Sequence, residues 1–121
     1  MTPARRTWVV RLTSAAKADF EEILRWTAEH LGETQAEAYA ETLLDAIEAL
    51  GTGPDAVGAR ARDELAKGVF TLHAARGGRK ARHFIVFRVA SKRGDRSVEI
   101  LRILHDAMDL RRHLPPRDET E

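Results

Sequence analysis

The histidines are the residues in this chain best suited to proton transfer or metal binding. There are five of them: His30, His73, His83, His105 and His113. No two are four residues apart, so the helical His pair that often holds zinc is missing. Ser14, Ser91 and Ser97 fall in expected caps and turns, outside any Gly-x-Ser-x-Gly setting, and cysteine is absent. We therefore predict no metal site and no cofactor.

Charge is divided unevenly along the chain. Residues 13–52 hold two Lys/Arg against nine Asp/Glu, a balance of −7, whereas residues 60–117 hold fifteen against six, a balance of +9. Oppositely charged regions can steer macromolecular partners, or they can simply attract each other as two solvated faces. No apolar run reaches the length of an export signal or a membrane span, and cysteine is absent, so we expect a cytoplasmic protein.

The elements that must position these side chains can be read from apolar periodicity. All 121 residues are expected to form one α+β domain, with an N-terminal strand at residues 8–12. Two amphipathic helices follow, at 15–31 and 34–50, and their short link predicts an antiparallel hairpin. Hydroxyls at Thr13-Ser14 are expected to cap the first helix, and a capping box at Thr34 to open the second.

The second half of the chain predicts a mainly antiparallel sheet on which the helical hairpin packs. One helical turn is expected at residues 60–66, and a short C-terminal helix at 107–114. An ordered core over 7–114 and a flexible tail at 115–121 complete the prediction. The three expected strands form a meander in the order strand-helix-helix-strand-strand-strand, at residues 69–73, 83–90 and 98–105.

Several strings in this order resemble one known family. They are residues 10–23 (VRLTSAAKADFEEI), 62–65 (RDEL), 84–89 (FIVFRV) and 98–109 (VEILRILHDAMD). Together they are similar to ParE-type toxins of the RelE/ParE superfamily, over residues 9–114. The resemblance implies the toxin of a type II toxin–antitoxin system in a hetero-oligomeric complex with a ParD-like antitoxin, a ribbon-helix-helix DNA-binding protein. ParE members are understood to inhibit DNA gyrase by binding, whereas RelE members cut messenger RNA in the ribosome.

The choice between cutting and binding depends on the site. RelE-type nucleases share basic residues on the sheet and a Tyr or His-Tyr near the C-terminus. Tyr39, the only tyrosine, is expected to face the core, so a C-terminal phenol is missing. A nuclease would have to use His105 with Arg88 and Arg102, but Arg88 is also expected to pair with Glu99 across the hairpin. We predict a binding protein that is not an enzyme. A ribosome-dependent endonuclease and an inactive antitoxin-binding relative are the alternatives.

The expected binding residues form two groups. Trp26 is distinctive because it lies about 120° around the first helix from Phe20, so it either meets a partner or packs on the second helix or the C-terminal segment. The basic loop contains no aromatic residue for base stacking, so direct binding of single strands is not indicated. Direct sequence-specific DNA binding by this chain is not expected either. The antitoxin-binding candidates are Trp8, Trp26, Leu44, Arg76, Arg79, Lys80 and Arg82. The target-binding candidates are His105, Asp106, Met108, Arg111 and Arg112.

Overall fold

The computed structural model describes residues 8–90 and 96–114, and it confirms the predicted α+β fold. The predicted tail at 115–121 lies outside the described residues. In the labels used below, η marks a 3-10 helix. The elements are β1 (Val9–Leu12), α1 (Ser14–Leu31), α2 (Glu33–Ala49), η1 (Leu50–Thr52), β2 (Arg60–Ala61), β3 (Val69–His73), β4 (His83–Ala90), β5 (Ser97–His105) and η2 (Leu110–His113).

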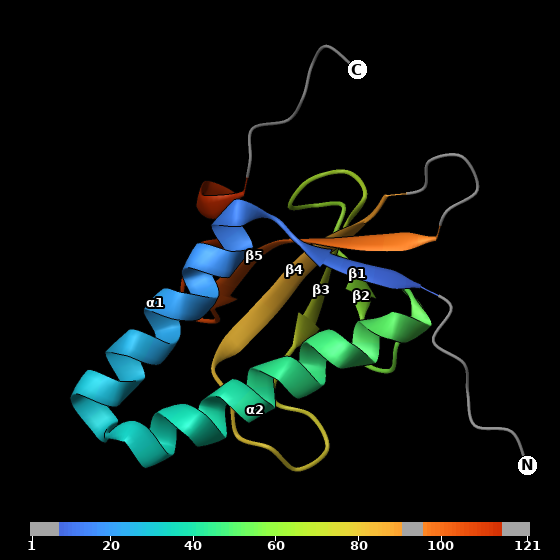
Figure 1. Ribbon diagram of the computed structural model, residues 1–121. Coiled ribbons are helices and arrows are strands. Elements are labelled where there is room, and N and C mark those ends of the chain that lie inside the picture. The colour runs from blue at the N-terminus through green and yellow to red at the C-terminus, as the bar shows by residue number, and fades with distance from the viewer. Residues whose placement is uncertain (1–7, 91–95, 115–121) are drawn as a thin grey trace, which may run out of the picture.

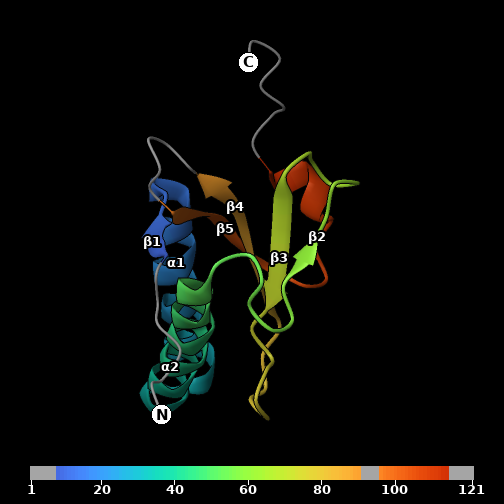
Figure 2. The same ribbon diagram turned by 90° about the vertical axis from the view of Figure 1, so that its right-hand side faces the viewer.

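Five strands form one sheet in the order β1-β5-β4-β3-β2. β1 runs parallel to β5, and every other neighbouring pair is antiparallel. The two helices meet at Gly32 and open from there toward the sheet as a V (Figure 1). Both helices cover one face of the sheet and η2 lies on the other (Figure 2). Among the described residues, no helix is both long and apolar enough to cross a membrane.

The start of α1 is fixed by the predicted hydroxyl cap. The Thr13 Oγ1 accepts a hydrogen bond from the Ala16 N–H at 3.1 Å and donates one to the Leu101 carbonyl at 2.9 Å. Further along α1, Asp19 accepts from the Ile103 N–H at 2.9 Å. β1 pairs only with residues 97–100 of β5, so α1 supplies the partners for the part of the β5 edge that β1 does not reach.

The predicted capping box at Thr34 is wrong. α2 begins at Glu33, its N-cap is Gly32, and no side chain caps it. The reason is that Gly32 serves both helices: its N–H donates to the Ala28 carbonyl, and its own carbonyl accepts from the Ala36 N–H. Its φ of +97° is a conformation that favours glycine. Because Gly32 alone joins the two helices, Thr34 already lies inside α2 and cannot be its N-cap.

Two apolar clusters hold the sheet, one on each face. The first lies under the helices, and its largest fully buried members are Phe87, Leu43, Leu50, Leu72, Ile85 and Ile100. The second, on the other face, consists of Val69, Val86, Leu101, Leu104 and Leu110. Each large side chain buried in this way stabilises the fold by roughly 1.5–3 kcal/mol.

Two short helices predicted from the sequence take other forms. Arg60 and Ala61 are not helical, because they pair with β3 as an edge strand, and residues 62–66 form a turn. The segment predicted as a helix over 107–114 is a turn followed by η2. Leu110 is the only buried residue of η2, since it inserts into the second cluster.

The predicted pairing of Arg88 with Glu99 is confirmed. The two residues are opposite each other in the β4–β5 ladder, and the Arg88 Nε lies 2.8 Å from the Glu99 Oε1. The register shifts by one residue between Val86 and Phe87, where β5 carries a bulge. The hairpin therefore keeps the expected register only on one side of the bulge.

The Arg88 pair should contribute little to stability. The Arg88 side chain is 55% exposed, so we expect Arg88→Ala to change the free energy of unfolding by less than about 1 kcal/mol. Phe87→Ala, at the next and fully buried position, serves as the control and should cost about 3–5 kcal/mol. Urea denaturation of both variants tests this, and a loss above about 2 kcal/mol for Arg88→Ala would contradict the exposed-pair interpretation.

Candidate functional site

A wide groove lies within the V of the two helices. It has a volume of about 910 Å³, and it ends at the sheet, where His83 and His105 stand. Large apolar side chains stay exposed at its rim, with Trp26 at 52% and Leu31 at 60%. Its other lining residues are Glu22, Ile23, Thr27, Gln35, Tyr39, Ala75, Arg79, Lys80, Ala81 and Arg82.

The three apolar antitoxin-binding candidates lie in different places. Trp26 lines the groove, is 52% exposed, and stacks on His30 of its own helix with ring centroids 4.2 Å apart. Leu44 is exposed but lies outside the groove. Trp8 packs against the first apolar cluster. Its ring also lies close to Gly53, where an added Cβ would be 2.5 Å from it. Of the three, only Trp26 is placed for a partner in the groove.

The basic loop between β3 and β4 supplies the cationic side of the groove. Arg79, Lys80 and Arg82 line it, and the Arg79 Nε lies 3.8 Å from Asp45. Arg76 instead donates a hydrogen bond to a backbone carbonyl of the loop before β2 and is not part of the lining. Three of the four basic candidates therefore line the same groove as Trp26.

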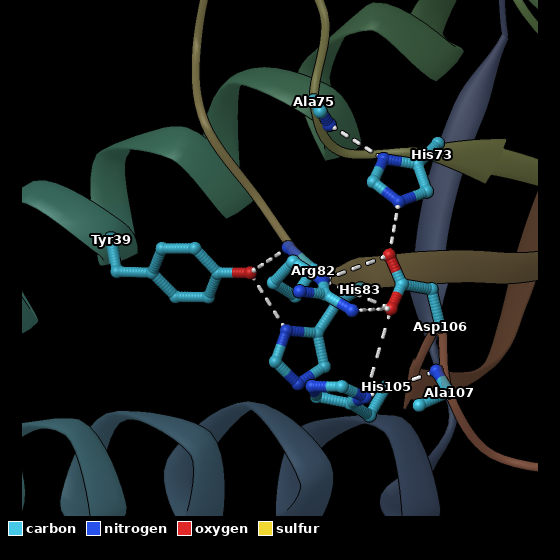
Figure 3. Close-up of polar contacts among 8 residues, drawn as sticks. All are labelled: Tyr39, His73, Ala75, Arg82, His83, His105, Asp106 and Ala107. Carbon is cyan, nitrogen blue, oxygen red and sulfur yellow. Dashed lines mark hydrogen bonds and ion pairs between the residues drawn. The ribbon is translucent and has the colours of Figure 1, made fainter.

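Asp106, which follows β5, connects the end of β3 to the residue before β4 at one end of the sheet. Its carboxylate accepts hydrogen bonds from the His73 Nε2 at 2.9 Å and the Arg82 Nε at 3.1 Å (Figure 3). These bonds, the one from His73 first, lower the pKa of Asp106 to about 2. Asp106 is thus ionised at neutral pH and is held by internal partners.

The position of Tyr39 corrects the sequence analysis. Its ring packs against the core as predicted, but its hydroxyl emerges at the end of the sheet. There the phenol accepts from the Arg82 N–H at 2.9 Å and lies 2.7 Å from the His83 Nδ1. Burial raises the pKa of Tyr39, which keeps the phenol protonated. The C-terminal segment has no tyrosine, but α2 places the Tyr39 hydroxyl at the same end of the sheet.

His83 and His105 form a pair of rings whose tautomers are set by their neighbours. They are opposite each other in the ladder, with ring centroids 5.2 Å apart. The Tyr39 hydroxyl already accepts from the Arg82 N–H, so we assign its own hydrogen as donated to the His83 Nδ1. The His105 Nδ1 accepts from the Ala107 N–H at 3.0 Å. With Nδ1 accepting, each ring carries a proton on Nε2. The His105 Nδ1 also lies 3.7 Å from Asp106, but this is no hydrogen bond while Nδ1 accepts from Ala107.

His83 should make stability fall in mildly acidic solution. Burial, aided by the neighbouring His105, lowers the pKa of His83 to about 4. The unfolded chain then binds more protons at this ring, so stability is complete above about pH 6.5 and is lost as pH falls through about 4. We expect the urea midpoint to decline across this range, and less steeply in His83→Gln. An NMR titration of the His83 ring with a midpoint above 6 would contradict this.

The residues expected for a nuclease are not brought together. Arg88 lies five positions along β4 from His83, a separation of about 16 Å at the usual strand rise. The Arg102 guanidinium is bound to both carboxylate oxygens of Asp19, at 2.7 and 2.9 Å. His105 therefore has neither predicted arginine beside it. The tyrosine and histidines that do surround it were not predicted as one site.

The target-binding candidates lie in different places, and only Arg111 and Arg112 belong to η2. His105 lines the groove, Asp106 is held internally, and Arg111 donates to a backbone carbonyl in the turn after β2. Met108 is 44% exposed, and the Arg112 Nε lies 3.7 Å from Asp109 on the surface. Besides His105 in the groove, Met108 and Arg112 have side chains available to a partner.

Comparison with known proteins identifies relatives along nearly the whole chain. Residues 10–110 match the profile of the family described as the ParE toxin of the type II toxin-antitoxin system, parDE. Toxin ParE1 of Mycobacterium tuberculosis (strain CDC 1551 / Oshkosh) is 35% identical over 103 residues, which cover 85% of this chain and 94% of that protein. Toxin ParE1 of Caulobacter vibrioides is 32% identical over 104 residues, covering 86% and 95%.

Solved structures support the same fold. A chain from the chromosomal ParDE TA system of P. aeruginosa superposes with a TM-score of 0.66 at 21% identity, covering 84% of this chain and 98% of that one. The YoeB/ParE toxin from Agrobacterium tumefaciens gives a TM-score of 0.56 at 18% identity, covering 80% and 97%. At these identities the superpositions bear on the fold, and the sequence matches establish the family. The resemblance seen in the sequence is confirmed, and the chain belongs to the ParE toxin family of type II toxin–antitoxin systems.

Proposed function

We propose that this chain is a toxin that inhibits DNA gyrase by binding it, and that a ParD-like antitoxin neutralises the toxin through the groove. The observation that carries the binding mechanism is the engagement of the expected catalytic arginines. Arg102 is held by Asp19. Arg88 is paired with Glu99 and lies about 16 Å along β4 from His83, the partner of His105 in the ladder. Neither guanidinium is therefore placed to stabilise a phosphate near His105. Membership of the ParE family supports the same mechanism.

The groove is suited to an amphipathic helical segment. Its α1 side runs from Glu22 to Leu31, nine residue steps or about 13 Å at the rise of an α-helix. That length matches roughly two and a half turns of a partner helix, whose apolar face would lie on Trp26 and Leu31. The rim residues Arg79 and Lys80 favour an acidic partner.

Expression in a bacterial host tests both parts of this proposal. The chain is induced alone and together with the product of the neighbouring gene, which we expect to encode a ribbon-helix-helix protein with an acidic C-terminal segment. We expect growth arrest, loss of gyrase supercoiling and intact messenger RNA when the chain is alone, and recovery in the pair. Messenger RNA cleavage with normal supercoiling would favour the endonuclease instead. No effect on either would indicate an inactive antitoxin-binding relative.

Matched variants locate the antitoxin site. Trp26→Ala should prevent rescue by the neighbouring protein, because it removes the largest exposed apolar side chain of the groove. Leu44→Ser, at an equally exposed position outside the groove, should leave rescue unchanged. The reverse pattern would move the antitoxin site to the outer side of α2.

A further inference from the structure

We infer that the paired rings of His83 and His105 form the carboxylate-binding end of the groove. Their ligand would be one Asp or Glu side chain of the acidic, amphipathic segment of the antitoxin, so the inference rests on the proposed function. It adds a specific polar anchor to a site otherwise defined by apolar contacts and by charge.

The first argument is the direction of the available hydrogen bonds. Each ring accepts at Nδ1 and therefore presents an N–H at Nε2. Among the residues that the structure describes, neither Nε2 has an acceptor. Two ring N–H donors, on rings whose centroids are 5.2 Å apart at the end of an apolar groove, suit an acceptor that is an anion, and a carboxylate offers one oxygen to each. A metal ion would need an unprotonated nitrogen, and the unprotonated Nδ1 of each ring is already occupied by an internal hydrogen bond.

The second argument is that nearby protein carboxylates are already engaged. Asp19 is bound to Arg102 and to the Ile103 N–H, and Asp106 is bound to His73 and Arg82. Glu22, which lines the groove, accepts from the Arg25 guanidinium at 2.6 Å. The histidine pair therefore lacks an internal acceptor, and its natural complement is an acid from another chain.

The third argument is the position of the pair along the groove. Asp19 bonds to Ile103, so the Glu22 end of α1 lies near His105, while Leu31 lies toward the tip of the V. A partner helix with its acid over the histidines would place residues one and two turns away over Trp26 and Leu31. The recognised pattern is therefore an acidic residue with apolar residues four and seven positions away on the same face.

A small amphipathic acid tests this subsite without the antitoxin. The probe is 4-phenylbutyrate, and the matched control is 4-phenylbutyramide, which has the same apolar body without the charge. Binding is followed by NMR through the ring nitrogens of His83 and His105 at pH 7. We expect the acid to shift both Nε2 resonances and to bind at least about 5-fold more tightly than the amide.

Two substitutions at His105 separate the effect of the Nε2 hydrogen-bond donor from the effect of side-chain packing. In His105→Asn the amide oxygen can still accept from the Ala107 N–H, but the donor at the place of Nε2 is lost. His105→Gln can restore a donor there. The preference for the acid should disappear in His105→Asn and return in His105→Gln. Affinity for the purified neighbouring antitoxin should follow the same order, with about a 10-fold loss in His105→Asn.

The outcomes distinguish this inference from the proposed function. Equal affinity for acid and amide, no binding of either, or a preference that survives in His105→Asn would overturn the carboxylate subsite. If the antitoxin binds but is indifferent to both His105 substitutions, the proposed function stands and the subsite is wrong. If the acid preference is found and no antitoxin binds, the subsite stands and the proposed function is wrong.

Discussion

Asp19→Ala should lower the free energy of unfolding by about 3 kcal/mol, a large effect for a residue on a helix surface. The carboxylate binds Arg102 at two points and also accepts from the Ile103 N–H. The two charged side chains are largely buried, at 28% and 15% exposure for Arg102 and Asp19. Removing Asp19 leaves the Ile103 N–H without its partner and the Arg102 guanidinium without its counter-charge, with only the His113 carbonyl still accepting from it, and an uncompensated buried charge is costly.

Glu22→Ala is the matched control for Asp19→Ala. It removes a carboxylate from the same helix, where the pair with Arg25 is exposed, and it should cost less than about 0.5 kcal/mol. Asp19→Asn should fall between the two, because its amide oxygen can still accept from Ile103. Urea unfolding of the three variants measures the order. Equal losses for Asp19→Ala and Glu22→Ala would show that the β5 edge does not depend on α1.

The meander and its register could be predicted because they depend on local patterns. Runs of β-branched and aromatic residues define β3, β4 and β5, and the short connection between β4 and β5 leaves few registers for that hairpin. Arg88 and Glu99 are opposite each other for this reason. The bulge beside Val86 could not be foreseen, because both faces of the sheet are buried, so adjacent apolar residues in β5 do not mark an extra residue.

The remaining differences come from contacts distant in sequence. β1 pairs with β5, with Val9 opposite Ser97, and no local signal specifies a parallel partner that far along the chain. Residues 107–114 have apolar spacing compatible with a helix, but burial of Leu110 in the second cluster selects a single 3-10 turn. Tertiary packing decides the conformation of such short segments.

The candidate site could have been predicted in part. His73 ends β3, His83 begins β4 and His105 ends β5, so an antiparallel meander must bring these three to one end of the sheet. Neither metal spacing along a helix nor the nuclease role considered for His105 reveals this signal. Tyr39 could not be found in the same way. Helical phase gives the direction in which its ring leaves α2, but not that its hydroxyl reaches a histidine 44 residues away.

The structure also changes how the C-terminal end should be tested for target binding. Deleting the chain from Ala107 onward would remove Leu110, which is buried in the second cluster, so lost toxicity could reflect unfolding. Substituting only the exposed residues avoids this. Met108→Ser combined with Arg112→Glu keeps Leu110 and should change the free energy of unfolding by less than about 1 kcal/mol.

This double variant should lose growth arrest if the end of the sheet contacts gyrase. Removing an exposed apolar side chain and reversing a charge at an interface typically costs 2 kcal/mol or more, which corresponds to about 30-fold weaker binding. Val57→Ser, at another exposed apolar position away from η2, should keep full arrest. Supercoiling by purified gyrase in the presence of each folded variant measures the difference. Undiminished inhibition by the double variant would place the gyrase contact elsewhere on the toxin, because folding and the buried Leu110 would both be intact.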